Sequence, residues 1–138
     1  MLDATNEKII KMIESDAKQT NEQIAKALGL SEGAVRKRIK KLEEEKVIIG
    51  YKARIKHSLI GKTMIIIGFD IAPEYFNTAI EAIKSKEEAL EVYSTTGDHT
   101  AIAVAVTDSE KARQFVSSLE KIKGVRHVYP AFVQETIK

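Results

Sequence analysis

Residues 20–45, TNEQIAKALGLSEGAVRKRIKKLEEE, carry the clearest structural pattern in the chain. Apolar residues recur at helical spacing on both sides of Gly29, which predicts two helices joined by a very short turn. Thr20 and Gln23 have the spacing of a capping box at the start of the first helix, and Ser31 is a favoured N-cap for the second. Two helices that meet through a short glycine-containing turn are typical of a helix-turn-helix unit.

The second of these helices carries an uneven distribution of charge. Five cations lie within Arg36–Lys41, and three glutamates follow at residues 43–45. At about 100° per residue, Val35, Ile39 and Leu42 form an apolar stripe, so cations cover most of the remaining surface. Glutamates at the end of a helix oppose its dipole, and this order of charges favours a helix that lies on a polyanion. A merely solvated charged face is the alternative that the pattern leaves open.

The composition of the chain restricts the classes of protein to which it could belong. Of its 138 residues, 43% are hydrophobic and 30% are charged, as in soluble folded proteins. Cysteine is absent, which excludes disulfides, thiolate metal sites and cysteine nucleophiles. Residues 1–60 hold 13 basic and 9 acidic side chains, whereas residues 61–138 hold 9 and 11. The basic excess of the N-terminal part indicates a polyanion as its partner.

We expect neither a membrane segment nor an enzyme. The one long apolar run, Met64–Phe69, is far too short to cross a bilayer, and the first residues do not resemble a signal peptide. A cytoplasmic location is therefore expected. The three histidines, His57, His99 and His127, have no metal-ligand spacing, and no nucleophile–base pattern is evident. We therefore expect no catalytic residue, no metal site and no cofactor.

The remaining segments predict a second domain of a different type. A helix over residues 2–16 precedes the helix pair. The alternating pattern of VIIGYKARIK, residues 47–56, predicts a strand, and HSLIGK after it indicates a hinge. Six further elements follow in the order strand, helix, strand, strand, helix, strand, at residues 63–72, 73–85, 89–97, 99–108, 109–124 and 125–136. This order is typical of a ferredoxin-like sheet with both helices on one face.

The predicted fold class is therefore α+β. An N-terminal helix-turn-helix (winged-helix-like) domain is joined to a C-terminal ferredoxin-like βαββαβ domain. We expect the first domain at residues 1–50, a linking strand and hinge at residues 51–63, and the second domain at residues 64–138.

The central strands of the second domain are apolar on both faces. In the second of them, one face is predicted to carry Ala101, Ala103 and Ala105, and the other Ile102, Val104 and Val106. Two helices can cover only one face, so we expect a second copy of the chain to cover the other in a two-fold dimer. The alternative is that the N-terminal helices fold back over it.

Two segments carry a resemblance to a known family. LGLSEGAVRKRIKKLEEEKVIIGYKA at residues 28–53 and TTGDH at residues 95–99 resemble the Lrp/AsnC (feast/famine) transcription regulators, and the resemblance covers nearly the whole chain. It implies an N-terminal helix-turn-helix that binds double-stranded DNA, a linking strand, and a C-terminal ligand-binding domain that dimerises through its sheet. It also implies further assembly of dimers into tetramers or octamers. Small-molecule effectors of this family, usually amino acids, bind between dimers and change DNA binding or assembly.

The resemblance also implies which residues bind. Ser31–Lys41 match the recognition helix and Thr20–Leu28 the supporting helix, and the candidate DNA-binding residues are Thr20, Asn21, Ser31, Glu32, Gly33, Arg36, Lys37, Lys40 and Lys41. The candidate effector-binding residues are Gly97, Asp98, His99 and Thr100. Lys46 stands where the family usually has glycine, so either the helix ends on a strained left-handed lysine or it ends differently. Thr100 stands where amino-acid-binding members typically have aspartate, whose carboxylate would pair with a ligand ammonium group.

The sequence thus predicts a sequence-specific DNA-binding transcriptional regulator, modulated by a small molecule such as an amino acid bound between dimers. A constitutive architectural DNA-binding or assembly protein with no effector is the alternative. RNA-recognition folds share the strand order, but they stack bases on aromatic side chains of the central strands. Those strands here offer only Phe69, which indicates an interface rather than a stacking platform.

Overall fold

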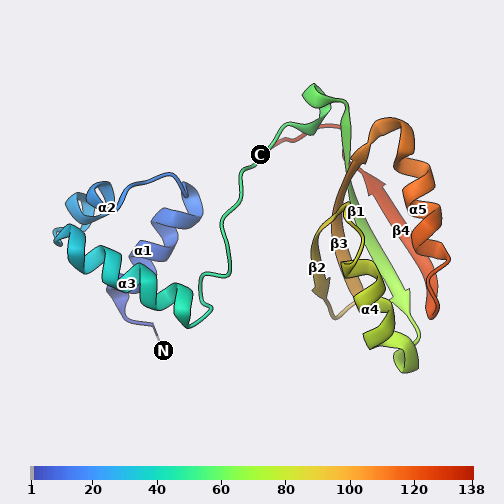
Figure 1. Ribbon diagram of the computed structural model, residues 1–138, viewed down its shortest axis with the longest axis horizontal. Helices are drawn as coiled ribbons and strands as arrows, with labels where there is room; N and C mark the ends of the chain where they lie inside the picture. Colours follow the sequence, from blue (N-terminus) through green and yellow to red (C-terminus); the bar gives the residue numbers. More distant parts are fainter. Residues whose placement is uncertain (1) are drawn as a thin grey trace. The chain divides into compact units, whose positions relative to one another are not determined.

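The computed structural model describes residues 2–138 and divides into two units. The first unit ends at Arg54, and the second spans Ile55–Lys138 (Figure 1). The division falls within the segment that the sequence predicts to link the two domains. In the described residues, none of the helices has the length and apolarity that a bilayer crossing requires.

The first unit contains the three predicted helices, which are α1 (Ala4–Ser15), α2 (Asn21–Leu28) and α3 (Glu32–Glu44). Figure 1 shows them packed around one another in this unit. Their shared core consists of five buried side chains, Ile9, Ile24, Ala25, Val35 and Leu42. The apolar stripe predicted for α3 therefore faces inward, with Ile39 half-buried beside it. Burial of this stripe leaves the opposite side of α3 for the cations.

Local hydrogen bonds cap the N-terminal ends of α2 and α3 at the residues that the sequence predicts. The Thr20 hydroxyl accepts from the Gln23 amide at 3.1 Å, and the Gln23 side chain accepts from the Thr20 amide at 2.9 Å. The predicted capping box is therefore confirmed. The Ser31 hydroxyl accepts from the Ala34 amide at 3.1 Å and caps α3. Between the two helices, Gly29 adopts the left-handed conformation with a φ of 68°.

The C-terminal end of α3 is strained. Lys46 has a φ of 59°, the left-handed conformation that glycine usually supplies at this position. The Val47 amide donates to the carbonyl of Leu42 at 2.9 Å, and the Lys46 amide donates to that of Glu43 at 3.1 Å. Of the two alternatives for this helix end, the strained left-handed lysine is the one that the structure adopts.

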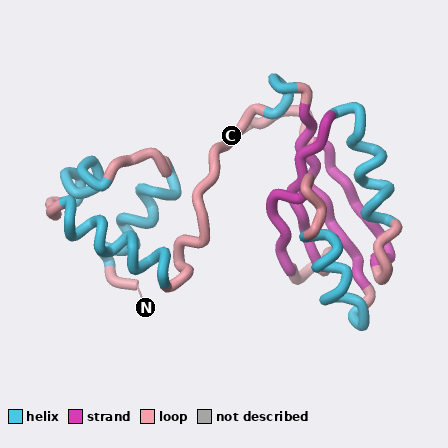
Figure 2. Tube along the Cα trace, viewed as in Figure 1, coloured by secondary structure: helices cyan, strands magenta, loops and turns pink. Residues whose placement is uncertain are grey.

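The predicted strand over residues 47–56 is not formed. These residues have no regular secondary structure, and Figure 2 draws them as loop. A strand requires a neighbour to pair with its backbone N–H and C=O groups, and this segment has no strand partner within the described chain. The hinge that follows forms a short 3-10 helix, η1 (His57–Ile60), which ends at the left-handed Gly61.

The second unit is the predicted ferredoxin-like domain. Its elements are β1 (Lys62–Ile71), α4 (Phe76–Lys84), β2 (Ala89–Ser94), β3 (Ala101–Asp108), α5 (Ala112–Glu120) and β4 (Val125–Phe132). One-turn 3-10 helices, η2 (Pro73–Tyr75) and η3 (Ser109–Lys111), lead into α4 and α5. The strands pair antiparallel in the order β2-β3-β1-β4. Figure 1 shows α4 and α5 on the same side of the sheet.

The two faces of the sheet have different surroundings within this unit. Ile65, Ile67 and Phe69 of β1 are buried against α4 and α5, and the alanines of β3 pair with them on the same face. The opposite face, here called the open sheet face, carries Met64, Ile66, Tyr93, Ile102, Val104, Val106 and Tyr129. Ile66, at its centre, is 43% exposed. The predicted division of side chains between the two faces is confirmed.

Candidate nucleic-acid interface and effector loop

Four cations project from α3 on the side away from the core. Arg36, Lys37, Lys40 and Lys41 are exposed, whereas Val35 on the opposite side is fully buried. This arrangement follows from the helical period, because the core stripe occupies positions that the cations do not share. The result is a positively charged, solvent-facing surface over the middle of the helix, at residues 36–41.

The N-terminal ends of α2 and α3 add uncharged groups to this surface. Thr20 and Ser31 are exposed caps, and Asn21 opens α2 in a half-buried position. Gly33 is exposed, and a Cβ atom built on it would meet no other atom within 4 Å. Packing within the chain therefore does not require glycine at this position. Its effect is to leave the backbone of the first turn of α3 open to close approach.

Three ion pairs lie along α3. Arg36 contacts Glu32 at 2.7 Å, and two weaker pairs of the same i,i+4 spacing follow nearer the C-terminal end. These are Lys40–Glu44 at 3.9 Å and Lys41–Glu45 at 3.8 Å. Lys37 is the one outward cation of α3 that has no ion pair to any residue in the range 2–138.

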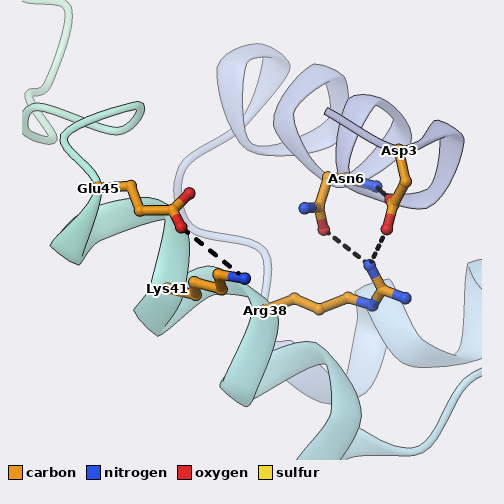
Figure 3. Close-up of polar contacts among 5 residues, drawn as sticks. All are labelled: Asp3, Asn6, Arg38, Lys41 and Glu45. Carbon is orange, nitrogen blue, oxygen red and sulfur yellow. Dashed lines mark hydrogen bonds and ion pairs between the residues drawn. The ribbon is translucent and has the colours of Figure 1, made fainter. Parts of the chain in front are cut away.

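Arg38 behaves differently from its neighbours on α3. Its guanidinium donates to a carboxylate oxygen of Asp3 at 2.8 Å and to the amide oxygen of Asn6 at 3.0 Å (Figure 3). The other Asp3 oxygen accepts from the Asn6 backbone amide at 2.7 Å and caps α1. The hydrogen bond from Arg38 holds the pKa of Asp3 below the ordinary aspartate value.

We call these three residues the Arg38 lock, because they join the middle of α3 to the start of α1. The sequence pattern does not predict the bonds of Arg38 to Asp3 and Asn6. The available signal was that Arg38 lies nearer the apolar stripe than the other cations do.

The candidate effector loop joins β2 to β3 and is closed by its own hydrogen bonds. The Thr95 amide donates to the carbonyl of Thr100 at 3.1 Å, and the Thr95 hydroxyl donates to that of His99 at 2.7 Å. Gly97, with a φ of 95°, and Asp98 are exposed at the tip of the loop. His99 and Thr100 are half-buried against the sheet.

The side chain of Thr100 is committed to the sheet. Its hydroxyl accepts from the Ile71 amide at 3.0 Å and donates to the carbonyl of Phe69 at 3.1 Å. Its backbone amide also donates to the carbonyl of Phe69, at 2.9 Å. These bonds lie at the place where the β1–β4 register shifts, between Asp70 and Ile71. Thr100 therefore stabilises an irregular strand end, and its hydroxyl has both a donor and an acceptor within the protein.

The ring of His99 lies over the backbone of Gly68 on the open sheet face. A Cβ atom at Gly68 would come within 2.7 Å of that ring, so a side chain there would displace it. The ring centroids of His99 and Tyr129 are 5.0 Å apart, within the range of an aromatic contact. The Nδ1 atom of His99 is buried and has no hydrogen-bond partner among residues 2–138. Gly68 was missed by sequence reasoning, although a glycine inside an apolar strand is a known sign of close approach.

The structure thus places the candidate residues in two separate groups, each within one unit. The DNA-binding candidates lie at the starts of α2 and α3 and along the outer side of α3. The effector candidates lie in the β2–β3 loop. In the described part of the chain, no three His, Cys, Asp or Glu side chains are grouped as metal ligands would be.

Comparison with known proteins assigns both units to families. Residues 2–49 match the winged helix-turn-helix DNA-binding family, and residues 64–138 match the Lrp/AsnC ligand-binding domain. Over 141 aligned residues the chain is 38% identical to the HTH-type transcriptional regulator LrpA of Pyrococcus horikoshii, and the match covers 100% of both chains.

Two solved structures show the same fold. The crystal structure of PH0061 superposes with a TM-score of 0.90 at 19% identity, covering 100% of this chain and 96% of that one. The NMB0573/L-Met complex from Neisseria meningitidis superposes with a TM-score of 0.75 at 22% identity, covering 100% of this chain and 93% of that one. The helical unit, the four-stranded sheet and the full-length match lead to one assignment. The chain belongs to the Lrp/AsnC family of helix-turn-helix transcriptional regulators, which are DNA-binding proteins and not enzymes.

Proposed function

We propose that this protein regulates transcription by docking α3 into the major groove of specific DNA sites. One observation carries this proposal: α3 buries its apolar stripe and presents its exposed cations on the opposite side. The major groove is about 12 Å wide and admits one helix. The N-terminal residues of that helix make most of the contacts with base edges. Because the partner is DNA, we infer that the protein acts in the cytoplasm.

The candidate residues divide by chemistry into two roles. Arg36, Lys37, Lys40 and Lys41 would contact phosphates, which set the affinity and its dependence on salt. The start of α3, at Ser31–Gly33, would approach the base edges, where hydroxyl and carboxylate groups can read donors and acceptors. Thr20 and Asn21, at the start of the supporting helix, would hold the DNA backbone.

A salt titration tests this assignment. Replacing Lys37 and Lys40 by alanine should flatten the slope of log affinity against log salt by about two, because each phosphate contact contributes about 0.9. The matched control is Lys8→Ala/Lys11→Ala, which removes two exposed cations from α1. We expect the control slope to stay close to that of the unmodified protein. Equal slopes in all three proteins would remove α3 from the interface.

We further propose that two copies pair through the open sheet face. Within the second unit, Ile66 stays 43% exposed at the centre of that face, and α4 and α5 occupy the other one. A self-complementary apolar patch is most simply covered by a second copy related by a two-fold axis. Such dimers would assemble further into tetramers or octamers, which would bring several DNA-reading helices onto one regulatory region.

The effector is proposed to be a small molecule such as an amino acid, held by the loop Gly97–Thr100 at a seam between dimers. The family match of residues 64–138 supports this, as does the complex of NMB0573 with L-Met. A specific observation favours the second candidate, a constitutive DNA-binding protein without an effector. The hydroxyl of Thr100 is hydrogen-bonded to the backbone of β1, and the ring of His99 packs on Gly68.

Ligand screening separates these two candidates. Thermal-shift measurements on the full chain with each of the common amino acids should raise the melting temperature for at least one, because a ligand that binds only the folded state stabilises it. Replacing Asp98 by alanine, at the exposed tip of the loop, should weaken that response. If no amino acid changes the melting temperature and calorimetry detects no binding, the constitutive DNA-binding role is the one supported.

A further inference from the structure

Two of the ion pairs on α3 run in the less favourable order. In Lys40–Glu44 and Lys41–Glu45 the cation precedes the anion, whereas an isolated helix is stabilised more by glutamate placed before lysine. Both glutamates also lie at the end of α3, where the helix dipole disfavours negative charge. Helix stability therefore favours the reverse order of charges over the one that the chain has.

The two carboxylates lie beside ammonium groups that are proposed to contact DNA phosphates. Figure 3 shows the carboxylate of Glu45 directed at the ammonium of Lys41, at 3.8 Å. Lys40 and Glu44 are arranged in the same way at 3.9 Å. A carboxylate and a phosphate are both anionic oxygen acceptors, so a phosphate competes with the glutamate for either lysine. All four side chains are at least half exposed, which keeps the exchange possible.

We propose that Glu44 and Glu45 are specificity-determining residues that withhold Lys40 and Lys41 from DNA lacking an operator. On non-specific DNA, phosphate contacts supply essentially all of the binding energy, and the complex is loose. The lysines then keep their intramolecular partners. On an operator, base contacts made by the start of α3 fix the helix in one pose and hold phosphates beside both lysines. The exchange then becomes favourable, so the two contacts form only in the specific complex.

This inference rests on the proposed docking of α3, and it predicts an effect confined to non-specific DNA. Glu44→Gln/Glu45→Gln frees both lysines, so the salt slope on a duplex without an operator should steepen by about two. The non-specific affinity at low salt should rise about tenfold, from two added phosphate contacts. On an operator the slope should stay unchanged, because the lysines already contact phosphates there. The ratio of specific to non-specific affinity should therefore fall.

The matched control is Glu43→Gln. Glu43 belongs to the same run of glutamates but to none of the three ion pairs, so it reports general repulsion by a nearby carboxylate. The single variants Glu44→Gln and Glu45→Gln should each steepen the non-specific slope by about one, and Glu43→Gln by much less. Glutamine has nearly the shape of glutamate, and circular dichroism checks that the exposed substitutions leave the fold intact.

The experiment is fluorescence anisotropy of the full chain on two labelled duplexes over a range of salt. One duplex is enriched by the protein from a random pool, and the other is a shuffled version of it. Non-specific slopes equal to that of the unmodified protein would overturn the inference, as would a slope change in Glu43→Gln as large as in the other two. Lys40→Ala/Lys41→Ala separates this failure from that of the docking proposal. If it flattens the operator slope, α3 is on the DNA and only the specificity role falls; if it does not, both fall.

Discussion

Arg38 shows how one residue in a charged run can have a role of its own. Its neighbours on α3 face solvent, whereas its guanidinium bridges Asp3 and Asn6 at 2.8 and 3.0 Å. The Nη1 group of Arg38 thus already has two acceptors within the protein. The contribution of Arg38 is to fix α3 against α1, so that the outward cations are held in a constant orientation.

The charge of Asp3 should make this lock dependent on pH. Its pKa is lowered in the folded protein, so the stabilisation is present above the ordinary aspartate pKa of about 4 and is lost as the pH falls through the folded value. Asp3→Asn keeps a capping side chain but removes the charge. The difference in melting temperature between Asp3→Asn and the unmodified protein should therefore close on acidification. A difference that stays constant with pH would exclude the charge as its cause.

Gly68 gives a second prediction at this scale. Gly68→Ala should destabilise the protein by about 1–3 kcal/mol, because the new methyl group forces the His99 ring off the strand and away from Tyr129. In a His99→Ala background the same substitution should cost much less, since the space is then free. Chemical denaturation of the four proteins gives the coupling energy. Purely additive effects would mean that the ring does not limit the space at Gly68.

Single-residue features are predictable from the sequence when their partners are near in the chain. The caps at Thr20 and Ser31 depend on backbone amides three residues away, so local chemistry is sufficient to find them. The bond from Arg38 to Asp3 spans 35 positions and exists only after α1 and α3 have packed. The contact of His99 with Gly68 likewise depends on how a loop folds onto a strand, which periodicity does not encode.

Among the secondary-structure elements, α3 is followed by a residue with a strained backbone, Lys46. Lys46→Gly should stabilise the first unit by about 1 kcal/mol, because glycine adopts the left-handed conformation without the steric cost of a Cβ atom. Lys46→Ala keeps the Cβ atom and should stay within about 0.5 kcal/mol of the unmodified protein. Urea denaturation followed at the helical circular dichroism band measures both. Equal stabilities for the glycine and alanine variants would argue against strain at this position.

Elements with a strong apolar pattern can be predicted from the sequence. The conformation of segment 47–56 cannot, because a strand there would need a second strand to pair with. The helices and the four strands follow the periods of their buried residues, and their ends differ from the predicted ones by a few residues. The segment 47–56 has the alternating pattern of a strand but no strand formed from it. Tyr51 and Ile55 on one side of it are 51% and 48% exposed. An alternating pattern alone does not form a strand, because backbone pairing requires a second segment.

For the whole molecule, we expect two copies to pair through the open sheet face. Ile66→Glu places a charge at the centre of that face, where burial in a dimer would be costly. Light scattering should show its native mass reduced relative to the unmodified protein. Ile137→Glu is the control, since Ile137 is 93% exposed and lies outside the open sheet face. An unmodified protein that is already a monomer would refute pairing, as would an Ile66→Glu variant of unchanged mass.

Docking of α3 requires its outward cations to lie on duplex DNA. Hydroxyl-radical footprinting of the full chain, on a duplex that the protein itself enriches from a random pool, tests this contact. We predict protected segments on one face of the duplex, about 34 Å apart. Protection should require a higher protein concentration in Lys37→Ala/Lys40→Ala and an unchanged one in Lys8→Ala/Lys11→Ala. A duplex with no protected segment, or an unchanged concentration dependence in Lys37→Ala/Lys40→Ala, would contradict the docking of α3.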